Sequence, residues 1–221
     1  KKTKRVRTNH FDAIVIGSGI SGGWAAKELC EAGLKTLVLE RGRDVKHIED
    51  YPSALRHPWE FPHGNKIPKR EANPIVSKCY AYDAGTEQFF VKDEKHPYVQ
   101  KKPFDWIRGY QVGGKSLIWA RQTQRWSQYE FDAPSRDGYA VEWPISYQEL
   151  APFYTQVEKF VGISGNQDGI PSLPDGHFLK PWELNCVEKH VQARVKEFYK
   201  GNRHVIIGRC AHLTSPEPQH I

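Results

Sequence analysis

The order of apolar and polar positions near the start of the chain predicts a strand, a helix and a second strand in succession. Residues 12–16 form a short apolar run rich in β-branched side chains, as expected for a strand buried on both faces. Residues 21–30 suit a helix, and Gly33 stands where a left-handed C-terminal cap belongs. A second apolar run, 35–40, predicts the next strand. We expect these elements to form one βαβ unit.

A glycine-rich turn joins the first strand to this helix. Gly17 permits the sharp turn, Gly19 lets the backbone approach a pyrophosphate, and Gly22 lets the helix pack tightly on the strand. The helix N-terminus adds free amides and a positive dipole end. A glycine turn of purely structural purpose is the alternative interpretation. The expected phosphate contacts are Gly17, Ser18, Gly19, Ile20, Ser21 and Gly22.

An acidic residue ends the second predicted strand. Glu40 lies eighteen residues after Gly22 and is followed by Arg41, which we include in the expected cofactor site. A carboxylate at this position can accept hydrogen bonds from both hydroxyls of an adenosine ribose, and it repels a 2′-phosphate. The pattern therefore favours FAD or NAD over NADP.

The regular pattern fades between residues 43 and 110, where prolines recur. We expect an extended excursion over a surface, and the sequence leaves open a lid, a loop that wraps the cofactor or a subunit contact. Within it, residues 80–85 and 88–91 are predicted to pair as a hairpin that turns near Gly85.

The last third of the chain carries two helical patterns. Ser146 and Glu149 form a capping box that starts a packing helix, and Gly162 ends it. Residues 183–200 predict a second amphipathic helix, and residues 204–208 predict a strand. The side chains of the second helix expected to face inward are Val187, Val191, Val195 and Phe198.

Charge and hydropathy exclude several classes of protein. The 221 residues carry a net charge of +6, but five basic residues lie in the first seven positions, and +1 remains without them. We interpret residues 1–10 as a basic tail and expect no nucleic-acid partner. No apolar run predicts a transmembrane segment or a signal peptide in these residues. We expect a soluble protein, and the cytoplasm and the periplasm both stay open.

Cysteine spacing gives little support for a disulfide scaffold or a metal site. The four cysteines are far apart and form no CxxC pair. Cys186 and His190 lie one helical turn apart, which makes a metal site conceivable, but two side chains on one helix do not complete a coordination shell. We therefore predict no metal.

A second glycine motif lies in residues 108–121, where Gly113, Gly114, Lys115 and Ser116 are followed by Trp119. Together with the first motif, this segment resembles the FAD-binding half of the glucose-methanol-choline oxidoreductases, whose second signature is a Gly-Gly pair followed by small hydroxyl residues. The resemblance extends over essentially the whole chain, and it implies that these residues contact the cofactor. A tight turn with an aromatic anchor is the structural alternative.

Details of this motif are similar to one branch of that family. The Gly-Gly-x-Ser-x-x-Trp form resembles the branch that contains gluconate and fructose dehydrogenases, glucoside 3-dehydrogenases and pyranose oxidases. In pyranose oxidases a histidine just before the tryptophan carries the flavin covalently, whereas this chain has Ile118. An alkyl side chain cannot form that bond, so the resemblance implies noncovalent FAD.

The resemblance also implies an architecture. We expect an α/β fold with a Rossmann-like FAD-binding domain over residues 11–140 and the beginning of a substrate-binding domain over residues 141–221. The catalytic histidine of the family lies far toward the C-terminus, and this chain ends before such a region. We therefore expect an incomplete chain with no catalytic residue of its own.

The implied activity is oxidation of a CH-OH group of a sugar or glycoside by hydride transfer to flavin N5. The expected partners are the sugar or glycoside substrate, the remaining C-terminal part of the enzyme, and an electron acceptor or small subunit. Two rivals stay open. An NAD-linked dehydrogenase would explain the first motif but not the Gly113-Gly114 segment, and a nonenzymatic scaffold would hold FAD without turnover.

Overall fold

The computed structural model describes residues 10–67 and 73–215. Its contacts divide the chain into two compact units, one ending at Trp119 and the other beginning at Ala120. Except for His10, the expected basic tail lies outside the described residues. The domain boundary expected between residues 140 and 141 stays a prediction.

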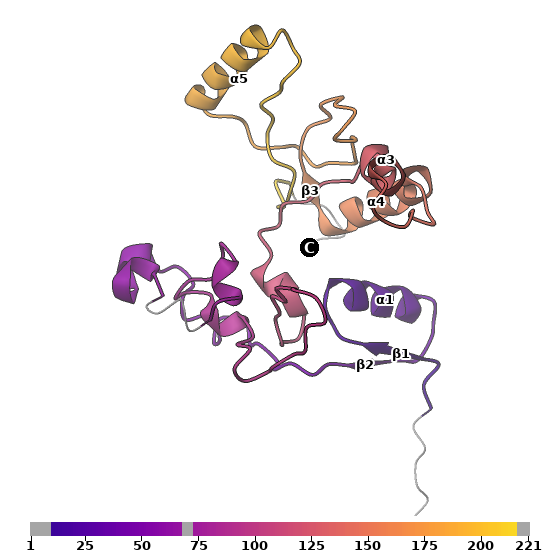
Figure 1. Ribbon diagram of the computed structural model, residues 1–221, viewed down its shortest axis with the longest axis vertical. Helices are drawn as coiled ribbons and strands as arrows, with labels where there is room; N and C mark the ends of the chain where they lie inside the picture. Colours follow the sequence, from indigo (N-terminus) through magenta and orange to yellow (C-terminus); the bar gives the residue numbers. More distant parts are fainter. Residues whose placement is uncertain (1–9, 68–72, 216–221) are drawn as a thin grey trace, which may run out of the picture. The chain divides into compact units, whose positions relative to one another are not determined.

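The first unit begins with the expected βαβ arrangement. Figure 1 shows the helix running along one side of the two strands. The strands are parallel, with Ala13 opposite Thr36 and Ile16 opposite Leu39. Gly33 has a φ of +83°, so the predicted left-handed residue after the helix is confirmed. These elements are β1 (Ala13–Ile16), α1 (Ile20–Glu31) and β2 (Thr36–Leu39).

The pair β1–β2 is covered on one face. An added Cβ on Gly22 of α1 would meet the side chain of Val15, which places the helix on that face. Side chains on the opposite face are exposed, at 60% for Ile14, 86% for Ile16 and 49% for Leu39. Burial on both faces was expected for these strands, and it is not found among the residues that the structure describes.

The segment from 43 to 110 is folded around a small core of its own. Val76, Tyr82 and Phe90 are buried together, and Ile118 packs against them. The segment is therefore not only a surface excursion. Its regular pieces in the described ranges are the 3-10 helices η1 (Pro58–Glu60), η2 (Pro62–Asn65), η4 (Val76–Lys78) and η5 (Glu87–Phe89).

The hairpin predicted for residues 80–91 is wrong. The carboxylate of Asp83 accepts hydrogen bonds from the backbone N–H groups of Gly85 at 2.9 Å and Thr86 at 3.0 Å. These bonds close a turn of the Asx type, and η5 follows it directly. The backbone donors that a hairpin would need are therefore used locally.

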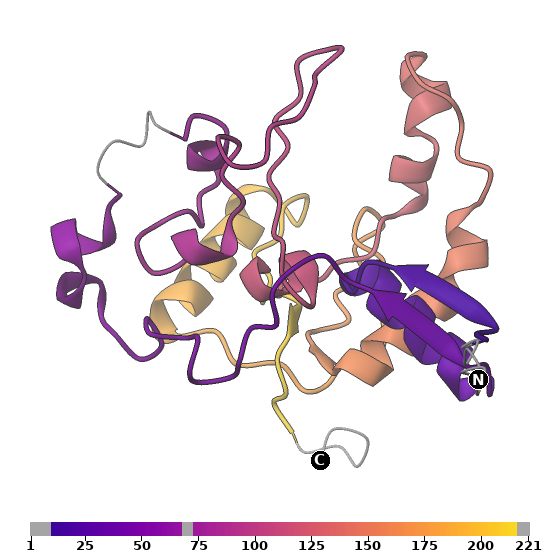
Figure 2. The same cartoon turned by 90° about the horizontal axis from the view of Figure 1, so that it is seen from below.

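The second unit contains four helices and a two-stranded sheet in its described part (Figure 2). The predicted capping box is confirmed, because Ser146 Oγ accepts from Glu149 N–H and Glu149 Oε2 accepts from Ser146 N–H. Gly162 has a φ of +77° and ends the helix as expected. The elements are α2 (Gln128–Phe131), α3 (Ala133–Asp137), α4 (Tyr147–Val161), β3 (Ile163–Ser164), α5 (Cys186–Phe198) and β4 (Cys210–Ala211), with β3 and β4 antiparallel.

Two expectations about the end of the chain are wrong. Within α5, three of the four side chains expected to face inward are exposed, at 66% for Val187, 44% for Val191 and 77% for Phe198, whereas Val195 is half-buried. The strand predicted at 204–208 is absent from the described structure, and the strand lies at β4 instead. The carbonyl of Val205 accepts from the Gln192 side chain at 2.6 Å, so it bonds to α5 rather than to a neighbouring strand.

The centre of the second unit holds two buried arginines. Arg125 donates two hydrogen bonds of 2.7 Å to the carboxylate of Glu158, and both side chains are at least 94% buried. Arg209 is fully buried and bonds to the carbonyl of Pro174 at 2.6 Å and to Asp175 at 2.8 Å.

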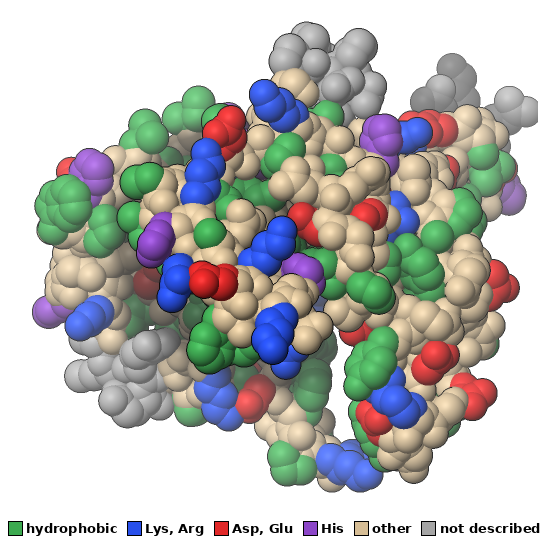
Figure 3. Space-filling model, turned by 90° about the horizontal axis from the view of Figure 1, so that it is seen from above, with side chains coloured by type: hydrophobic (Ala, Val, Ile, Leu, Met, Phe, Trp, Pro, Cys, Tyr) green, Lys and Arg blue, Asp and Glu red, His purple; other side chains and the backbone are tan. Residues whose placement is uncertain are grey.

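Charged side chains of both signs are interspersed on the molecular face in Figure 3. No helix in the described ranges has the length and apolar character needed to cross a membrane.

Candidate nucleotide site

The first glycine turn is shaped by two different constraints. Gly17 has a φ of +91°, and its N–H donates to the carbonyl of Leu39 at 2.7 Å, which ties the turn to β2. A Cβ on Gly22 would clash with the carbonyl oxygen of Gly17. Gly19 differs from both, because its φ is −64° and an added Cβ would have no atom within 4 Å. Internal packing therefore gives no reason for glycine at position 19.

The start of α1 presents backbone donors. Gly19 is the N-cap, no side chain caps the helix, and no acidic residue lies in the first turn. The N–H of Gly23 donates to the carbonyl of Gly19 at 2.7 Å, so the N–H groups of residues 20–22 precede the helical ladder. These donors and the helix dipole suit an anionic group such as a pyrophosphate. The open space at Gly19 lies at the same helix end.

The carboxylate of Glu40 is hydrogen-bonded to the first glycine turn. It accepts hydrogen bonds from Ser18 Oγ at 2.6 Å, from Ser18 N–H at 2.8 Å and from Gly42 N–H at 2.8 Å. These hydrogen bonds lower the pKa of Glu40 from 4.5 to about 2. The Ser18 hydroxyl contributes most, followed by the two backbone donors. Glu40 is therefore ionised at neutral pH and can accept a hydrogen bond from a hydroxyl group.

The second glycine motif meets the first in the same unit. Gly113 and Gly114 have φ values of +88° and +58°, and η6 (Gly114–Ile118) begins there. The N–H of Gly113 donates to Ser18 Oγ at 3.0 Å. A Cβ on Gly114 would lie 3.2 Å from the Cα of Gly19. The two glycine motifs, far apart in the sequence, thus contact each other in the structure.

Residues outside the two predicted motifs support this contact. Gln111 is 2% exposed, and its side-chain amide donates to the carbonyl of Gly114 at 3.0 Å. Gly42 touches the same segment so closely that a Cβ would clash with the backbone of Tyr110 and Gln111. In the sequence, only Gly42, a glycine two residues after Glu40, could have indicated this close approach of two backbone segments. No pattern in the sequence distinguishes Gln111.

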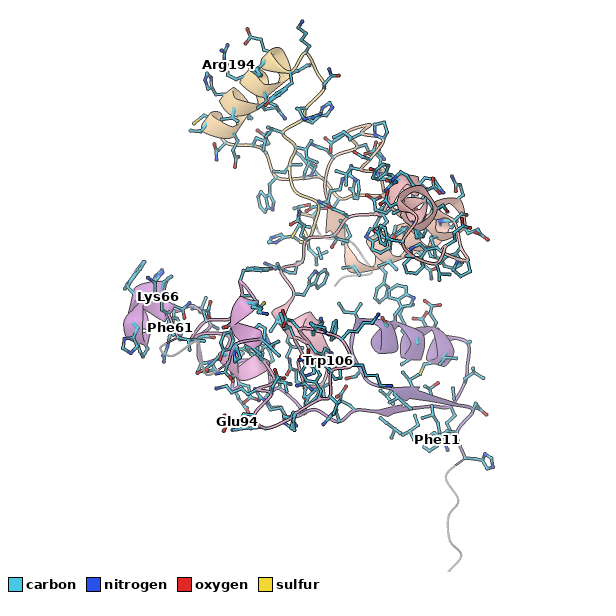
Figure 4. All side chains as sticks on the ribbon, viewed as in Figure 1. Phe11, Phe61, Lys66, Glu94, Trp106 and Arg194 are labelled. Carbon is cyan, nitrogen blue, oxygen red and sulfur yellow. The ribbon has the colours of Figure 1, made fainter. Side chains whose placement is uncertain are left out.

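An aromatic and cationic cluster lies beside Glu40. The guanidinium of Arg41 stacks over the ring of Tyr110, 3.8 Å from its centroid. Arg108 is 5% exposed, bonds to the Tyr110 hydroxyl at 3.2 Å and lies over the ring of Trp106, which is labelled in Figure 4. These contacts fix Arg41 next to the acid. Tyr110 was not identified from the sequence.

The other predicted site residues surround the two turns. Ile20 and Ser21 are exposed in the first turn of α1, and Lys115 is exposed at the start of η6. Ser116 Oγ donates to the carbonyl of Gly113 at 2.7 Å, which braces the second turn. Trp119 follows η6 and is 38% exposed. The described residues contain no group of three or more His, Cys, Asp or Glu side chains arranged to hold a metal.

The chain is similar in sequence to several known proteins. No family model matches the chain. The chain is 31% identical over 170 residues to 2-methyl-1,2-propanediol dehydrogenase of Mycolicibacterium austroafricanum, covering 74% of this chain and 26% of that protein. It is 29% identical over 184 residues to the fructose dehydrogenase large subunit of Gluconobacter japonicus, covering 80% and 31%.

A third relative is the gluconate 2-dehydrogenase flavoprotein of Pantoea cypripedii, at 30% identity over 167 residues. That match covers 70% of this chain and 26% of the relative. The chain therefore spans between about a quarter and a third of the length of these curated relatives.

Proposed function

We propose that this chain, which belongs to the glucose-methanol-choline oxidoreductase family, provides the FAD-binding part of an enzyme that oxidises a CH-OH group of a sugar or glycoside. The observation that carries the proposal is the contact between the two glycine turns, with Glu40 held beside them. The names of the relatives support it, since they include a flavoprotein and dehydrogenases of fructose, gluconate and a diol.

The residues present fit FAD. Gly19 keeps space open at the start of α1, and the free N–H groups of Ile20 to Gly22 can donate to the pyrophosphate. The ionised Glu40 can accept ribose hydroxyls and repels a 2′-phosphate, with Arg41 beside it. We assign the flavin side of the site to Gly113, Gly114, Lys115, Ser116 and Trp119.

Noncovalent binding is part of the proposal. Ile118 packs against the core of Val76, Tyr82 and Phe90, and its alkyl side chain offers no atom for a bond to flavin. Binding then depends on hydrogen bonds and shape from the two turns. We expect denaturation in acid or heat to release the cofactor into the supernatant.

When bound, FAD supplies a hydride acceptor for oxidation of the substrate carbon. The residues described here bind and orient it, and we assign none of them to the removal of the hydroxyl proton. That base belongs to a part of the enzyme outside this chain or to a partner. We further propose a dehydrogenase whose electrons leave to a separate acceptor or small subunit.

Two alternatives give different observations. In an NAD-linked dehydrogenase, the Gly113-Gly114 turn beside Gly19 would have no flavin to contact. Such a protein would bind NADH but no flavin. A nonenzymatic scaffold would contain flavin that no substrate reduces. We favour the flavoenzyme because both glycine turns then contact the same cofactor.

The test is an anaerobic visible absorption spectrum of the purified full-length protein before and after addition of sugars and glycosides. Flavin bands that bleach with one compound would support the function and identify its substrate class. Flavin bands that no compound bleaches would favour the scaffold. A folded, FAD-supplemented protein without flavin bands would contradict the assignment.

A further inference from the structure

The hydroxyl of Ser18 connects two parts of the site. It donates to Glu40 Oε2 across 2.6 Å and accepts a hydrogen bond of 3.0 Å from the N–H of Gly113. Glu40 follows β2, whereas Gly113 begins the second glycine turn. One side-chain oxygen therefore forms a hydrogen-bonded path from the acid to that turn.

Chemistry fixes the direction of both bonds. The backbone N–H of Gly113 can only donate, and an ionised Glu40 carboxylate can only accept. A hydroxyl has one hydrogen to give and lone pairs to receive, so Ser18 satisfies both partners at once. Alanine or glycine at position 18 could satisfy neither. The bond to Glu40 is of the charge-assisted class, which is stronger than a bond between neutral groups.

We propose that Ser18 is a positioning residue that couples the orientation of Glu40 to the placement of the Gly113-Gly114 turn. The inference rests on the proposed function for the identity of the ligand. Through this coupling, one side chain aligns the adenosine end and the flavin end of the cofactor site. Glu40 keeps two backbone donors, Ser18 N–H and Gly42 N–H, when the hydroxyl is removed, so the substitution tests orientation rather than loss of the acid.

The first test compares ADP with FAD on the full-length protein by calorimetry. ADP carries the ribose and the pyrophosphate but no flavin, so it senses Glu40 without the second turn. We expect Ser18→Ala to weaken ADP binding about tenfold, the effect of losing one charge-assisted hydrogen bond. The affinity for FAD should fall by a larger factor, since the N–H of Gly113 also loses its acceptor, the Ser18 hydroxyl.

Three variants control this comparison. Ser18→Thr keeps the hydroxyl and is expected to restore most of the affinity for both ligands. Ser53→Ala removes a hydroxyl that donates to the carbonyl of Gly85 at 2.9 Å in the same unit, and it should change neither affinity. Ser116→Ala removes the hydroxyl that donates to the carbonyl of Gly113 in the second turn. It should lower the affinity for FAD but not for ADP. If Ser18→Ala does not fold, Ser18→Cys replaces it, and the same changes are expected at smaller size because a thiol donates and accepts only weakly.

A second readout needs no nucleotide. An NMR titration of the Glu40 carboxyl carbon is expected to show a higher midpoint in Ser18→Ala than in the wild type, and amide exchange at Gly113 is expected to be faster. Unchanged values of both, together with an unchanged ratio of ADP to FAD affinity, would overturn the coupling. If the wild type binds neither ligand but Ser18→Ala still shows both NMR changes relative to it, the proposed function is rejected and the coupling is retained.

Discussion

A Cβ added to Gly114 would lie 3.2 Å from the Cα of Gly19, so two glycine turns from distant parts of the chain touch. The space beside Gly114 is therefore too small for a side chain without a shift of its neighbour. The approach explains why position 114 carries glycine, since a Cβ there would press on the backbone of Gly19. The N–H of Gly113, bonded to Ser18 Oγ at 3.0 Å, holds the same contact from the side.

Position 19 should separate ligand binding from folding. Gly19→Ala places a methyl group in open space at a backbone conformation that alanine accepts. We expect a loss of at most about 1 kcal/mol in the free energy of unfolding, since alanine is a poorer N-cap than glycine. FAD affinity should fall, because the methyl group enters the space assigned to the pyrophosphate. Calorimetry and urea unfolding measure the two effects, and an unaltered affinity would contradict that assignment.

Position 22 should behave in the opposite way. Gly22→Ala forces a methyl group against the carbonyl oxygen of Gly17, so α1 must move away from β1. We expect a loss of about 1–3 kcal/mol in the free energy of unfolding, as for overpacked sites. The matched control is Gly23→Ala, whose Cβ would meet its nearest atom at an ordinary 3.7 Å. The Gly23→Ala variant should have an unchanged or slightly higher free energy of unfolding, since alanine favours the helix.

The pH dependence of stability should contain a contribution from Glu40. Its pKa is lowered from 4.5 to about 2, chiefly by the Ser18 hydroxyl, so the folded state favours the ionised form. The stabilisation is complete above about pH 4.5 and is lost as the pH falls toward 2. In Glu40→Gln this part of the profile should disappear. Urea unfolding between pH 3 and 6 tests it, and parallel profiles for the two proteins would show that Glu40 contributes nothing.

The buried ion pair of the second unit should be sensitive to loss of its acid. Glu158→Gln removes the charge that faces Arg125, and both side chains of this pair are at least 94% buried in the structure. Breaking a buried pair in this way costs about 3–5 kcal/mol, because an uncompensated charge is left inside. The control is Glu197→Gln, which breaks the exposed pair with Arg194 and should cost at most about 1 kcal/mol. Thermal unfolding of both variants makes the comparison, and equal losses would contradict the argument.

Local patterns in the sequence predicted the elements that carry the site. The βαβ unit, the position of Gly33 and the Ser146–Glu149 capping box depend on residues close together in the chain, and all three are confirmed. The resemblance to a family brought Gly113 and Gly114 into the cofactor site. Their contact with Gly19 needed the structure, because no local pattern encodes a meeting of distant turns.

The failures also have physical causes. The apolar residues at 89–91 are typical of a strand, but the Asp83 side chain accepts the N–H groups of Gly85 and Thr86 in a turn just before them. Gln111 reads as an ordinary polar residue, yet it is buried because its amide satisfies the carbonyl groups of Gly114 and Phe89. The inward face predicted for α5 failed because periodicity shows which side chains are apolar, not what covers them.

The uncovered face of the β1–β2 pair has a practical consequence for handling the chain. Ile14, Ile16 and Leu39 present an apolar strip to water, and such strips drive association between molecules. We expect the 221-residue chain, when expressed by itself, to be recovered with chaperones or as soluble aggregates. Dilution and mild detergent should favour the monomer. Replacement of Ile16 by threonine, which keeps β-branching and removes apolar area, offers a direct route to a better-behaved sample.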